Sequence, residues 1–436
     1  MKFSTASQAL YGAVTVSAMS IPDAIEDTVQ DVVQSLLELV DMSGIQHFPT
    51  ITPEEAHNSA DQGLLELFEN FGDLFSDKDD DDVSQTQTTT TTITTTTSST
   101  TTFSSAAAGP PGPFGHTKTN MMKPNNQTVP SNQTANDGDD ATTEGASAPT
   151  CDPKNPNVRV EWRNMTETDR SAFMDSLKCL LDAPSKGSQY TGSTNRYEDL
   201  VAVHHTMTSS IHGYAQFLLW HRYFVWIFEK LLRDECSLKG PMPWWDETLD
   251  SGNFSAAPLF TDDYFGPLPE RPSETQAYCI NPPRLNGIRL HIGPGQAFEE
   301  RCLSRGLNQT QAGYVTQNFV NDCNARATYN EMRGCNELGP HAYGHNSIGG
   351  IMADVSSSVG DPVFFMHHTF VDHSYRIWQN ANATRTQVVD GCVDSKSPCT
   401  PITNDFVLSS MGLAENVTAG QMINTLGGYL CYKYSH

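Results

Sequence analysis

The sequence predicts a mainly α-helical domain with long loops and disulfides, at residues 151–436 of the 436-residue chain. Three observations support this fold class. All ten cysteines and all six tryptophans lie beyond residue 150. Several segments of this region carry apolar residues at helical spacing. Residues 237–340, which separate these segments, are rich in Gly, Pro and Asn and are expected to form long loops.

Five segments of this domain are expected to be helices. Thr166–Leu181 begins with Thr166-x-x-Asp169, which is similar to a capping box, and its apolar residues share one face. The other expected helices are Asn195–Thr206, Phe217–Arg233, His341–Gly349 and Pro362–Ala381.

The residues before the domain differ from it in composition. Residues 21–75 are a candidate helical pro-region, because Ile25–Met42 and Leu64–Phe75 are amphipathic. A weakly ordered segment fits this acidic stretch equally well, since it holds few residues that could build a core. Residues 76–150, rich in Asp, Thr and Pro, are expected to be a disordered linker.

Several features indicate a secreted protein. Residues 1–20 are expected to be a signal peptide with a small-residue cleavage site. Ten cysteines without a CxxC pair favour disulfides in an oxidising compartment, with reduced core thiols as the alternative. Seven N-x-S/T sequons favour glycosylation. They begin at Asn126, Asn132, Asn164, Asn253, Asn308, Asn382 and Asn416.

The charge and hydropathy of the chain argue against binding to nucleic acid and against association with membranes. The formal net charge of −25 disfavours nucleic acid and anionic membrane surfaces as partners. No run of 18 apolar residues is present, so no transmembrane helix is expected.

Ten of the fourteen histidines lie between residues 204 and 373, mostly in two groups. His341 and His345 are four residues apart, so on a helix they share one face and can reach one ion. His221 and His368 lie in strongly apolar stretches. A buried imidazole needs partners for both nitrogens, and a metal on one nitrogen with a hydrogen bond on the other satisfies both.

The ligand type narrows the choice of metal. Sites made only of imidazoles suit copper, zinc, iron or nickel. Two clusters of three histidines, without a nearby Cys or carboxylate ligand, favour a pair of copper ions. A zinc protease would need H-E-x-x-H, whereas His341-Ala342-Tyr343-Gly344-His345 has no glutamate.

Two longer motifs resemble the copper signatures of the tyrosinase and catechol oxidase family. The first is His212–Phe224 (HGYAQFLLWHRYF), and the second is Asp361–His368 (DPVFFMHH) followed by Asp372. The resemblance covers about residues 151–380. It implies a four-helix bundle that holds a dinuclear type 3 copper site, in a short form without a C-terminal shielding domain.

The resemblance also implies the ligands. It assigns His204 rather than His205, because of the spacing after Tyr197–Val201, and His368 rather than His367, because of the spacing from Asp361. The first copper would be held by His204, His212 and His221, and the second by His341, His345 and His368. His205 and His367 become neighbours of the site, with His367 a candidate for a catalytic role.

Further positions carry over from the family pattern. Glu337, four residues before His341, matches a glutamate that orients a water in the active site of plant-type catechol oxidases. Three positions would line the substrate pocket: Phe364, which would wall the copper pair, Val355 at the gate, and Asn346 after the second ligand of the second copper.

The resemblance implies oxidation of ortho-diphenols to ortho-quinones by dioxygen, with a small phenol or catechol as substrate. Monophenol ortho-hydroxylation is left open, because Ala342 replaces an Asn found in many tyrosinases. Two alternatives remain. One is a hemocyanin-like dioxygen carrier, in which residues 21–75 could cover the copper site as a pro-peptide. The other is an extracellular glycoprotein with a vestigial copper site.

Overall fold

The computed structural model describes residues 39–58 and 151–436. The expected signal peptide at 1–20 and linker at 76–150 lie outside the described residues. Within them, no helix has the length and hydrophobicity needed to cross a membrane.

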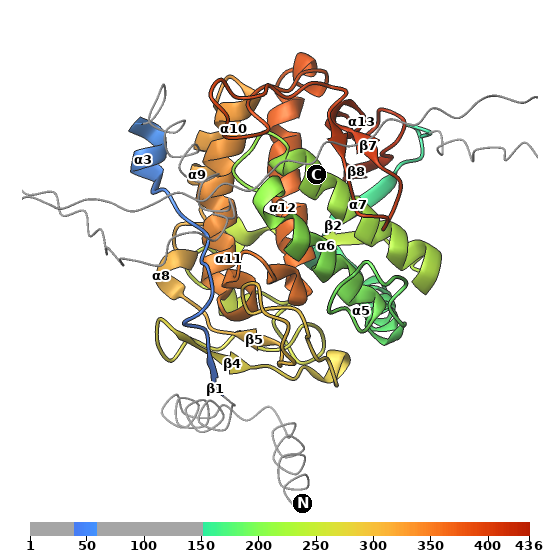
Figure 1. Cartoon of the computed structure of the whole chain (residues 1–436), viewed down its shortest axis with the longest axis vertical. Coiled ribbons are helices and arrows are strands. Elements are labelled where there is room, and N and C mark those ends of the chain that lie inside the picture. Colours follow the sequence, from blue (N-terminus) through green and yellow to red (C-terminus); the bar gives the residue numbers. More distant parts are fainter. Residues whose placement is uncertain (1–38, 59–150) are drawn as a thin grey trace, which may run out of the picture. The chain divides into compact units, whose positions relative to one another are not determined.

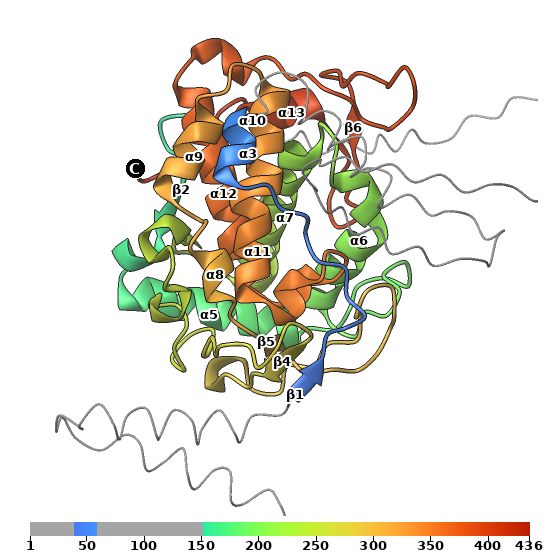
Figure 2. The ribbon, with the colours of Figure 1, turned by 90° about the vertical axis from the view of Figure 1, so that its left-hand side faces the viewer.

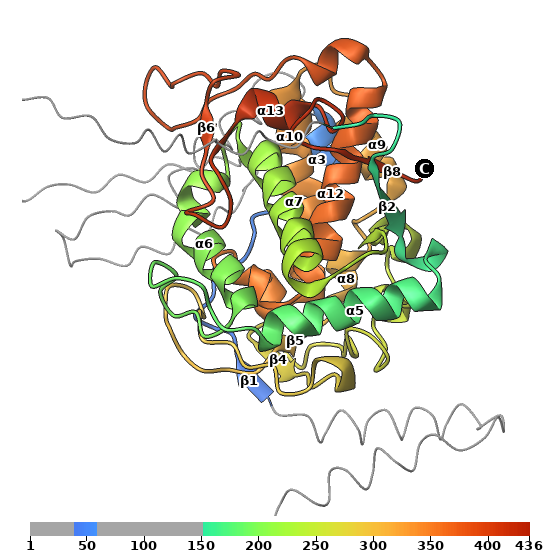
Figure 3. The ribbon, with the colours of Figure 1, turned by 90° about the vertical axis from the view of Figure 1, so that its right-hand side faces the viewer.

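A bundle of helices forms the centre of the fold, which confirms the predicted mainly α class (Figure 1). Helix α12 packs against α7, and α6 and α11 each contact one of these two helices. Helix α5 contacts α6 and α7 and crosses beside their ends (Figure 3). The helix bounds are α5 Glu167–Asp182, α6 Arg196–Ile211, α7 Phe217–Cys236, α11 Ala342–Ile348 and α12 Val363–Asn380.

The ends of these helices follow capping rules. Thr166 accepts a hydrogen bond from the amide of Asp169 at the start of α5, as its motif predicts. Asn195 caps α6 in the same way through the amide of Glu198. Ser237 ends α7 in the left-handed conformation, with φ of 59°. The five helices therefore begin within about one residue of the predicted starts, whereas α6 ends at Ile211, beyond the predicted Thr206, and α7 ends at Cys236, beyond the predicted Arg233.

The region 237–340 is only partly loop, which corrects the prediction. It contains the short helix α8 (Gln309–Ala312) and two longer helices, α9 (Gln317–Asn324) and α10 (Tyr329–Asn336). Thr316 caps α9, and Thr328 forms a full capping box with Glu331 on α10. These Thr motifs were a signal in the sequence, which the Gly, Pro and Asn content of the whole region obscured.

Short strands and disulfides tie the loops to the bundle. The strands are β1 (Leu39–Asp41), β2 (Asn157–Glu161), β3 (Met242–Trp244), β4 (Gln276–Cys279), β5 (Ser304–Arg305), β6 (Val407–Leu408), β7 (Val417–Thr418) and β8 (Tyr432–Tyr434). They form the sheets β1-β4-β5, β3-β2-β8 and β6-β7. All ten cysteines are paired, as Cys151–Cys431, Cys179–Cys236, Cys279–Cys302, Cys323–Cys335 and Cys392–Cys399. The expectation of disulfides is confirmed.

Residues 39–58, which we call the strap, lie along the domain (Figure 2). The strap begins with β1 (Leu39–Asp41), which pairs antiparallel with β4, and ends with α3 (Pro53–Asn58), which contacts α9. Residues 39–41 were expected to end the helix Ile25–Met42. Pairing with the edge of β4 explains the difference, because a partner strand overrides a helical pattern.

A buried ionic cluster holds α7, α12 and β2 together. The carboxylate of Asp372 accepts hydrogen bonds from Arg222 at 2.5 Å and Arg159 at 3.0 Å, and from the hydroxyls of Tyr432 and Tyr434. Burial alone would raise the pKa of Asp372, but the two arginines and the two hydroxyls lower it below its ordinary value. Asp372 is therefore charged in the folded protein.

Replacing this carboxylate should strongly destabilise the fold. Asp372→Asn leaves two buried guanidinium groups without full compensation, which costs about 3–5 kcal/mol and should lower Tm in a thermal melt. Because folding lowers the pKa of Asp372, its contribution is present above about pH 4 and is lost as the pH falls through the folded-state value. Asp182→Asn, which removes only an exposed pair with Lys178, is the control. An equal Tm change in both variants would contradict this role.

Candidate dinuclear metal site

The first histidine group lies between α6 and α7. His204 is on α6, His212 ends that helix, and His221 is on α7. All three are buried, and each offers one nitrogen within 4.8 Å of the others. These are the three residues expected to hold the first ion.

Backbone carbonyls fix the orientation of these rings. The Nδ1 atoms of His204, His212 and His221 lie 3.1, 3.0 and 2.9 Å from the carbonyl oxygens of Ser356, Thr208 and Phe217. A carbonyl only accepts, so each Nδ1 carries the hydrogen and each Nε2 keeps its lone pair. The Nε2 atoms of His204 and His221 have no hydrogen-bond partner among the described residues, which is costly unless they bind an ion.

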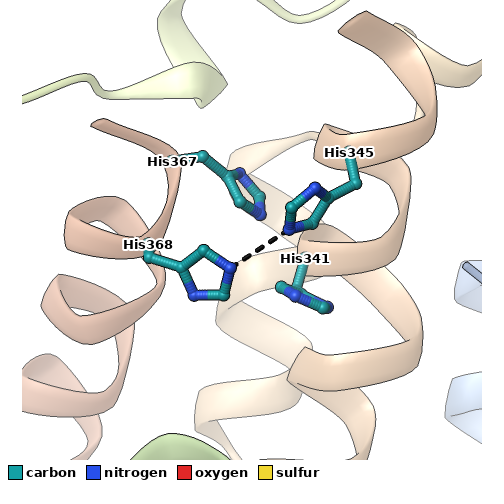
Figure 4. A group of neighbouring side chains, drawn as sticks. All are labelled: His341, His345, His367 and His368. Carbon is teal, nitrogen blue, oxygen red and sulfur yellow. Dashed lines mark hydrogen bonds between the residues drawn. The ribbon is translucent and has the colours of Figure 1, made fainter. Parts of the chain in front are cut away.

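The second group is formed by His341, His345, His367 and His368 (Figure 4). Nδ1 of His341 lies 2.9 Å from the carbonyl oxygen of Glu337, and Nδ1 of His345 lies 2.8 Å from that of Met352. The Nε2 atoms of His345 and His368 are 3.1 Å apart. Two nitrogens bound to one tetrahedral ion at about 2.0 Å would be separated by roughly this distance.

A break in the helical backbone precedes the second group. Between α10 and α11 the residues Glu337–His341 form a π-type turn (η5), and Gly339 has φ of −98° and ψ of −113°. Pro340 cannot donate to the helix ladder and favours such a break. Turns of this type occur frequently at functional sites. Here the turn brings the backbone of Glu337 to the ring of His341.

Two doublets of adjacent histidines, His204–His205 and His367–His368, have different surroundings. His205 lies outside both groups, because its Nε2 meets the carbonyl of Gly295 at 3.0 Å and its ring packs on Phe298. His367 belongs to the second group, but its Nδ1 lies 2.6 Å from the carboxylate of Glu247. His204 is thus distinguished from its neighbour by position, and His367 from His368 by its carboxylate partner.

Burial keeps the imidazoles neutral, as metal ligands must be. It lowers the pKa of His212 to about 4 and lowers that of the other five predicted ligands well below the ordinary value for histidine. Nearby histidines lower these values further, while bonds to carbonyls partly oppose the shift.

The two groups are contiguous. The rings of His221 and His368 stack with centroids 4.4 Å apart and an interplanar angle of 11°. Phe364 contacts both groups, with its ring 5.3 Å from that of His204 and 4.1 Å from that of His368. Phe364, a predicted substrate-pocket residue, therefore packs against one ring of each group.

Glu337 is buried beside both groups. One carboxylate oxygen accepts from the amide of Gly213 at 2.6 Å, next to His212, and the other accepts from Arg333 at 2.6 Å. Burial raises the pKa of Glu337 to about 7, although Arg333 and the Gly213 amide act in the opposite direction. Sequence reasoning identified this residue, but not its arginine partner.

Glu247 was missed by sequence reasoning. It is fully buried, and one of its oxygens has no hydrogen-bond partner in the described part of the chain. The Glu247–His367 pair fits against α11 because residue 344 is Gly. A Cβ there would lie 2.5 Å from the His367 ring and 2.6 Å from a Glu247 oxygen. The only sequence signal was the acidic pair Asp246-Glu247, which follows the apolar Pro243-Trp244-Trp245.

The predicted substrate-pocket residues Asn346 and Val355 contact the strap. The Asn346 amide donates to the carbonyl of Phe48 at 2.7 Å and accepts from its amide at 3.3 Å. The amide of Val355, a buried residue, donates to the carbonyl of Gln46 at 3.0 Å. Both contacts join segments some 300 positions apart.

The donor set fits a pair of copper ions. Both groups are buried, and their candidate ligand atoms are all imidazole nitrogens. The rings are neutral and fixed in orientation. Imidazole is a preferred ligand of copper, and fixed Nδ1–H groups are the usual support of a ligating Nε2.

Comparisons with known proteins agree with this donor set. The model of the common central domain of tyrosinase matches residues 194–381. Tyrosinase P from Aspergillus terreus is 29% identical over 338 residues, 66% of this chain and 94% of that protein. N-acetyl-6-hydroxytryptophan oxidase from Emericella nidulans is 27% identical over 348 residues, 65% of this chain and 93% of that protein. A polyphenol oxidase structure from Thermothelomyces thermophila gives a TM-score of 0.60 at 25% identity, covering 66% of this chain and 91% of that one.

The copper content of single variants should show which of His367 and His368 is a ligand. His368→Ala should reduce copper from about two ions to about one per chain, because it removes a ligand nitrogen. His367→Ala should retain both ions, because the family pattern assigns His368 rather than His367 as the third ligand of the second copper. Elemental analysis of purified protein measures this, with Tm confirming that each variant folds. Loss of copper from His367→Ala alone would reverse the assignment.

Proposed function

Because the chain belongs to the tyrosinase family of type 3 copper proteins, we propose that it oxidises ortho-diphenols to ortho-quinones with dioxygen at two copper ions. In the overall reaction two catechols each give up two electrons and two protons, and one dioxygen becomes two waters. The observation that carries the proposal is the pair of buried, contiguous histidine groups with backbone-fixed rings.

The copper pair would supply the redox chemistry with dioxygen when it is bound. The protein supplies the ligands, with His204, His212 and His221 for one ion and His341, His345 and His368 for the other. Phe364 places an apolar ring against His204 and His368, and an apolar wall that keeps water out would strengthen electrostatic interactions at the site.

Glu337 has a separate role in the proposal. Its oxygens each retain a lone pair beyond the bonds to Gly213 and Arg333. A water held there would take the hydroxyl proton of the docking phenol, which is general base assistance through one water.

The proposal places diphenol oxidation first and leaves monophenol hydroxylation as a secondary activity. Ala342 has no side chain that can accept a hydrogen bond beside His341, whereas many family members have Asn at this position. The substrate is proposed only as a phenol or catechol, because the relatives include an oxidase of a hydroxytryptophan derivative as well as tyrosinases.

We also propose that the protein is secreted and glycosylated, with a signal peptide at 1–20, a pro-region at 21–75 and a linker at 76–150 before the copper domain. Five disulfides support an oxidising compartment. Of the five sequon asparagines in the described residues, Asn164, Asn253, Asn382 and Asn416 are exposed, as glycosylation requires, and Asn308 is partly buried.

One observation favours a second candidate, reversible dioxygen binding without turnover. Phe48 of the strap covers part of the second histidine group, and carriers of the hemocyanin type also cover their copper site with a bulky residue. A carrier should fail to oxidise phenols even when this cover is removed.

The activity itself can be measured directly. Copper-loaded protein incubated with a catechol should produce the absorbance of an ortho-quinone and consume dioxygen, and a monophenol should react more slowly or not at all. His221→Ala, which lacks a proposed ligand, is the negative control. Absence of quinone from both substrates, with two coppers bound and the strap displaced, would reject the oxidase in favour of the carrier.

Glu337→Gln should lower kcat for catechol by roughly 100-fold, because it removes the proton acceptor. It should leave the copper content unchanged, because Glu337 is not a ligand. Arg333→Lys is the matched control, since it disturbs the same buried ion pair and keeps the carboxylate. If both variants lose the same activity and the same Tm, Glu337 is a structural partner of Arg333 only.

A further inference from the structure

The strap contacts the histidine groups through one aromatic ring. The Phe48 side chain stacks on His345, with ring centroids 4.0 Å apart and an interplanar angle of 16°. The edge of the same ring contacts His341 at 5.2 Å and His212 at 6.0 Å. Phe48 is 3% exposed, so its ring lies between ligands of both proposed ions rather than on the surface.

The backbone on both sides of Phe48 is fixed. The side chain of Asn346 accepts a hydrogen bond from the amide of Phe48 and donates one to the carbonyl of Phe48, as a neighbouring strand would. Two residues before Phe48, the Gln46 carbonyl accepts from Val355, and three residues after it, the amide of Ile51 donates to the carbonyl of Leu338. These partners belong to the segments that flank the second histidine group.

Both ends of the strap are anchored away from the histidines. At one end, β1 pairs with β4 and the buried Met42 donates its amide to Thr275. At the other end, α3 is capped by Thr52 and buries Ala56, whose carbonyl accepts from Arg326. The strap is therefore a built element that spans the site.

We infer that the strap is an internal inhibitor, in which Phe48 occupies the place of the substrate's aromatic ring and keeps the enzyme latent until the strap is displaced. This inference rests on the proposed function. A phenol has a flat ring of the same size as the Phe48 side chain. Phe48 occupies the face of His345 on which such a ring would stack. Asn346 and Val355, which were expected to line the substrate pocket, form hydrogen bonds with the strap backbone instead.

The covalent connection strengthens this inhibition. A segment of the same chain binds its site at an effective concentration in the millimolar range, so a free phenol at lower concentration competes poorly. Cleavage anywhere between the strap and Cys151 would make the strap a separate peptide. It would then dissociate according to its own affinity.

The test uses the full-length, copper-loaded protein and Phe48→Ala. Removing the ring should raise kcat/KM for a catechol at least tenfold, mainly through a lower KM, because the strap and the substrate compete for one place. Leu39→Ala is the matched control, since Leu39 lies in the same strap, is 50% exposed and pairs with Tyr278 of β4. Ile51→Ala, which removes a buried strap side chain and keeps the Phe48 ring, should give an intermediate increase.

A second measurement does not depend on turnover. Benzoate, a flat aromatic acid that the enzyme cannot oxidise, should bind more tightly to Phe48→Ala than to the unmodified protein in calorimetry. In the unmodified protein, saturating benzoate should speed hydrogen exchange at the amides of Phe48, Ile51 and Val355.

The outcomes separate the two proposals. Unchanged KM, unchanged benzoate affinity and continued protection of the strap amides would overturn the inhibitor. Tighter benzoate binding without quinone from any phenol would support the displaceable strap and reject the oxidase. Copper content and Tm of each variant confirm that the comparison is made on folded, loaded protein.

Discussion

The fixation of imidazole rings by backbone carbonyls is the constraint on which the rest of this structure depends. Five of the six proposed ligands direct Nδ1–H at a carbonyl oxygen, either one helical turn back or on a neighbouring loop. The ring then has one free lone pair and one direction in which to use it. For His368 no partner of Nδ1 exists among the described residues, and its position depends on packing against Phe364 and His221.

Such a centre requires a rigid surrounding. Buried neutral imidazoles are tolerated only while their nitrogens stay beside their partners, since an unpaired polar atom in the core is costly. The ionic cluster around Asp372 joins α7 to α12, each of which carries a proposed ligand. Asp361 pairs with Arg305 and caps the start of α12. Polar groups buried beyond the histidines thus hold the two helices at a fixed separation.

Local patterns in the sequence predicted the parts of the site that depend on local structure. The helices that carry His204, His221 and His368 followed from apolar periodicity, and the resemblance to the tyrosinase family assigned six ligands that the fold brings together in two groups. The choice of His204 over His205 agrees with the geometry, because one residue along a helix turns the side chain by about 100°.

Contacts between distant segments were not predictable in the same way. Glu247 meets His367 across 120 positions, and Phe48 meets Asn346 across 298. Local sequence patterns carry no information on such a pair, because each partner is unremarkable within its own segment and the contact depends on the tertiary fold. Helices α9 and α10 were missed for a different reason. They are short, and their stability comes from the Cys323–Cys335 disulfide and capping rather than from a long apolar face.

The place of the strap in the chain has a consequence for biosynthesis. Residues 39–58 leave the ribosome before any histidine of the site, and domains fold as they emerge from the N-terminus. The covering ring is thus already present when α11 and α12 close around the second group. A cover at the opposite end of the chain would arrive last and leave a newly made centre open for the time between. If the strap is the inhibitor inferred above, the order of synthesis leaves no interval in which a finished copper centre stands uncovered.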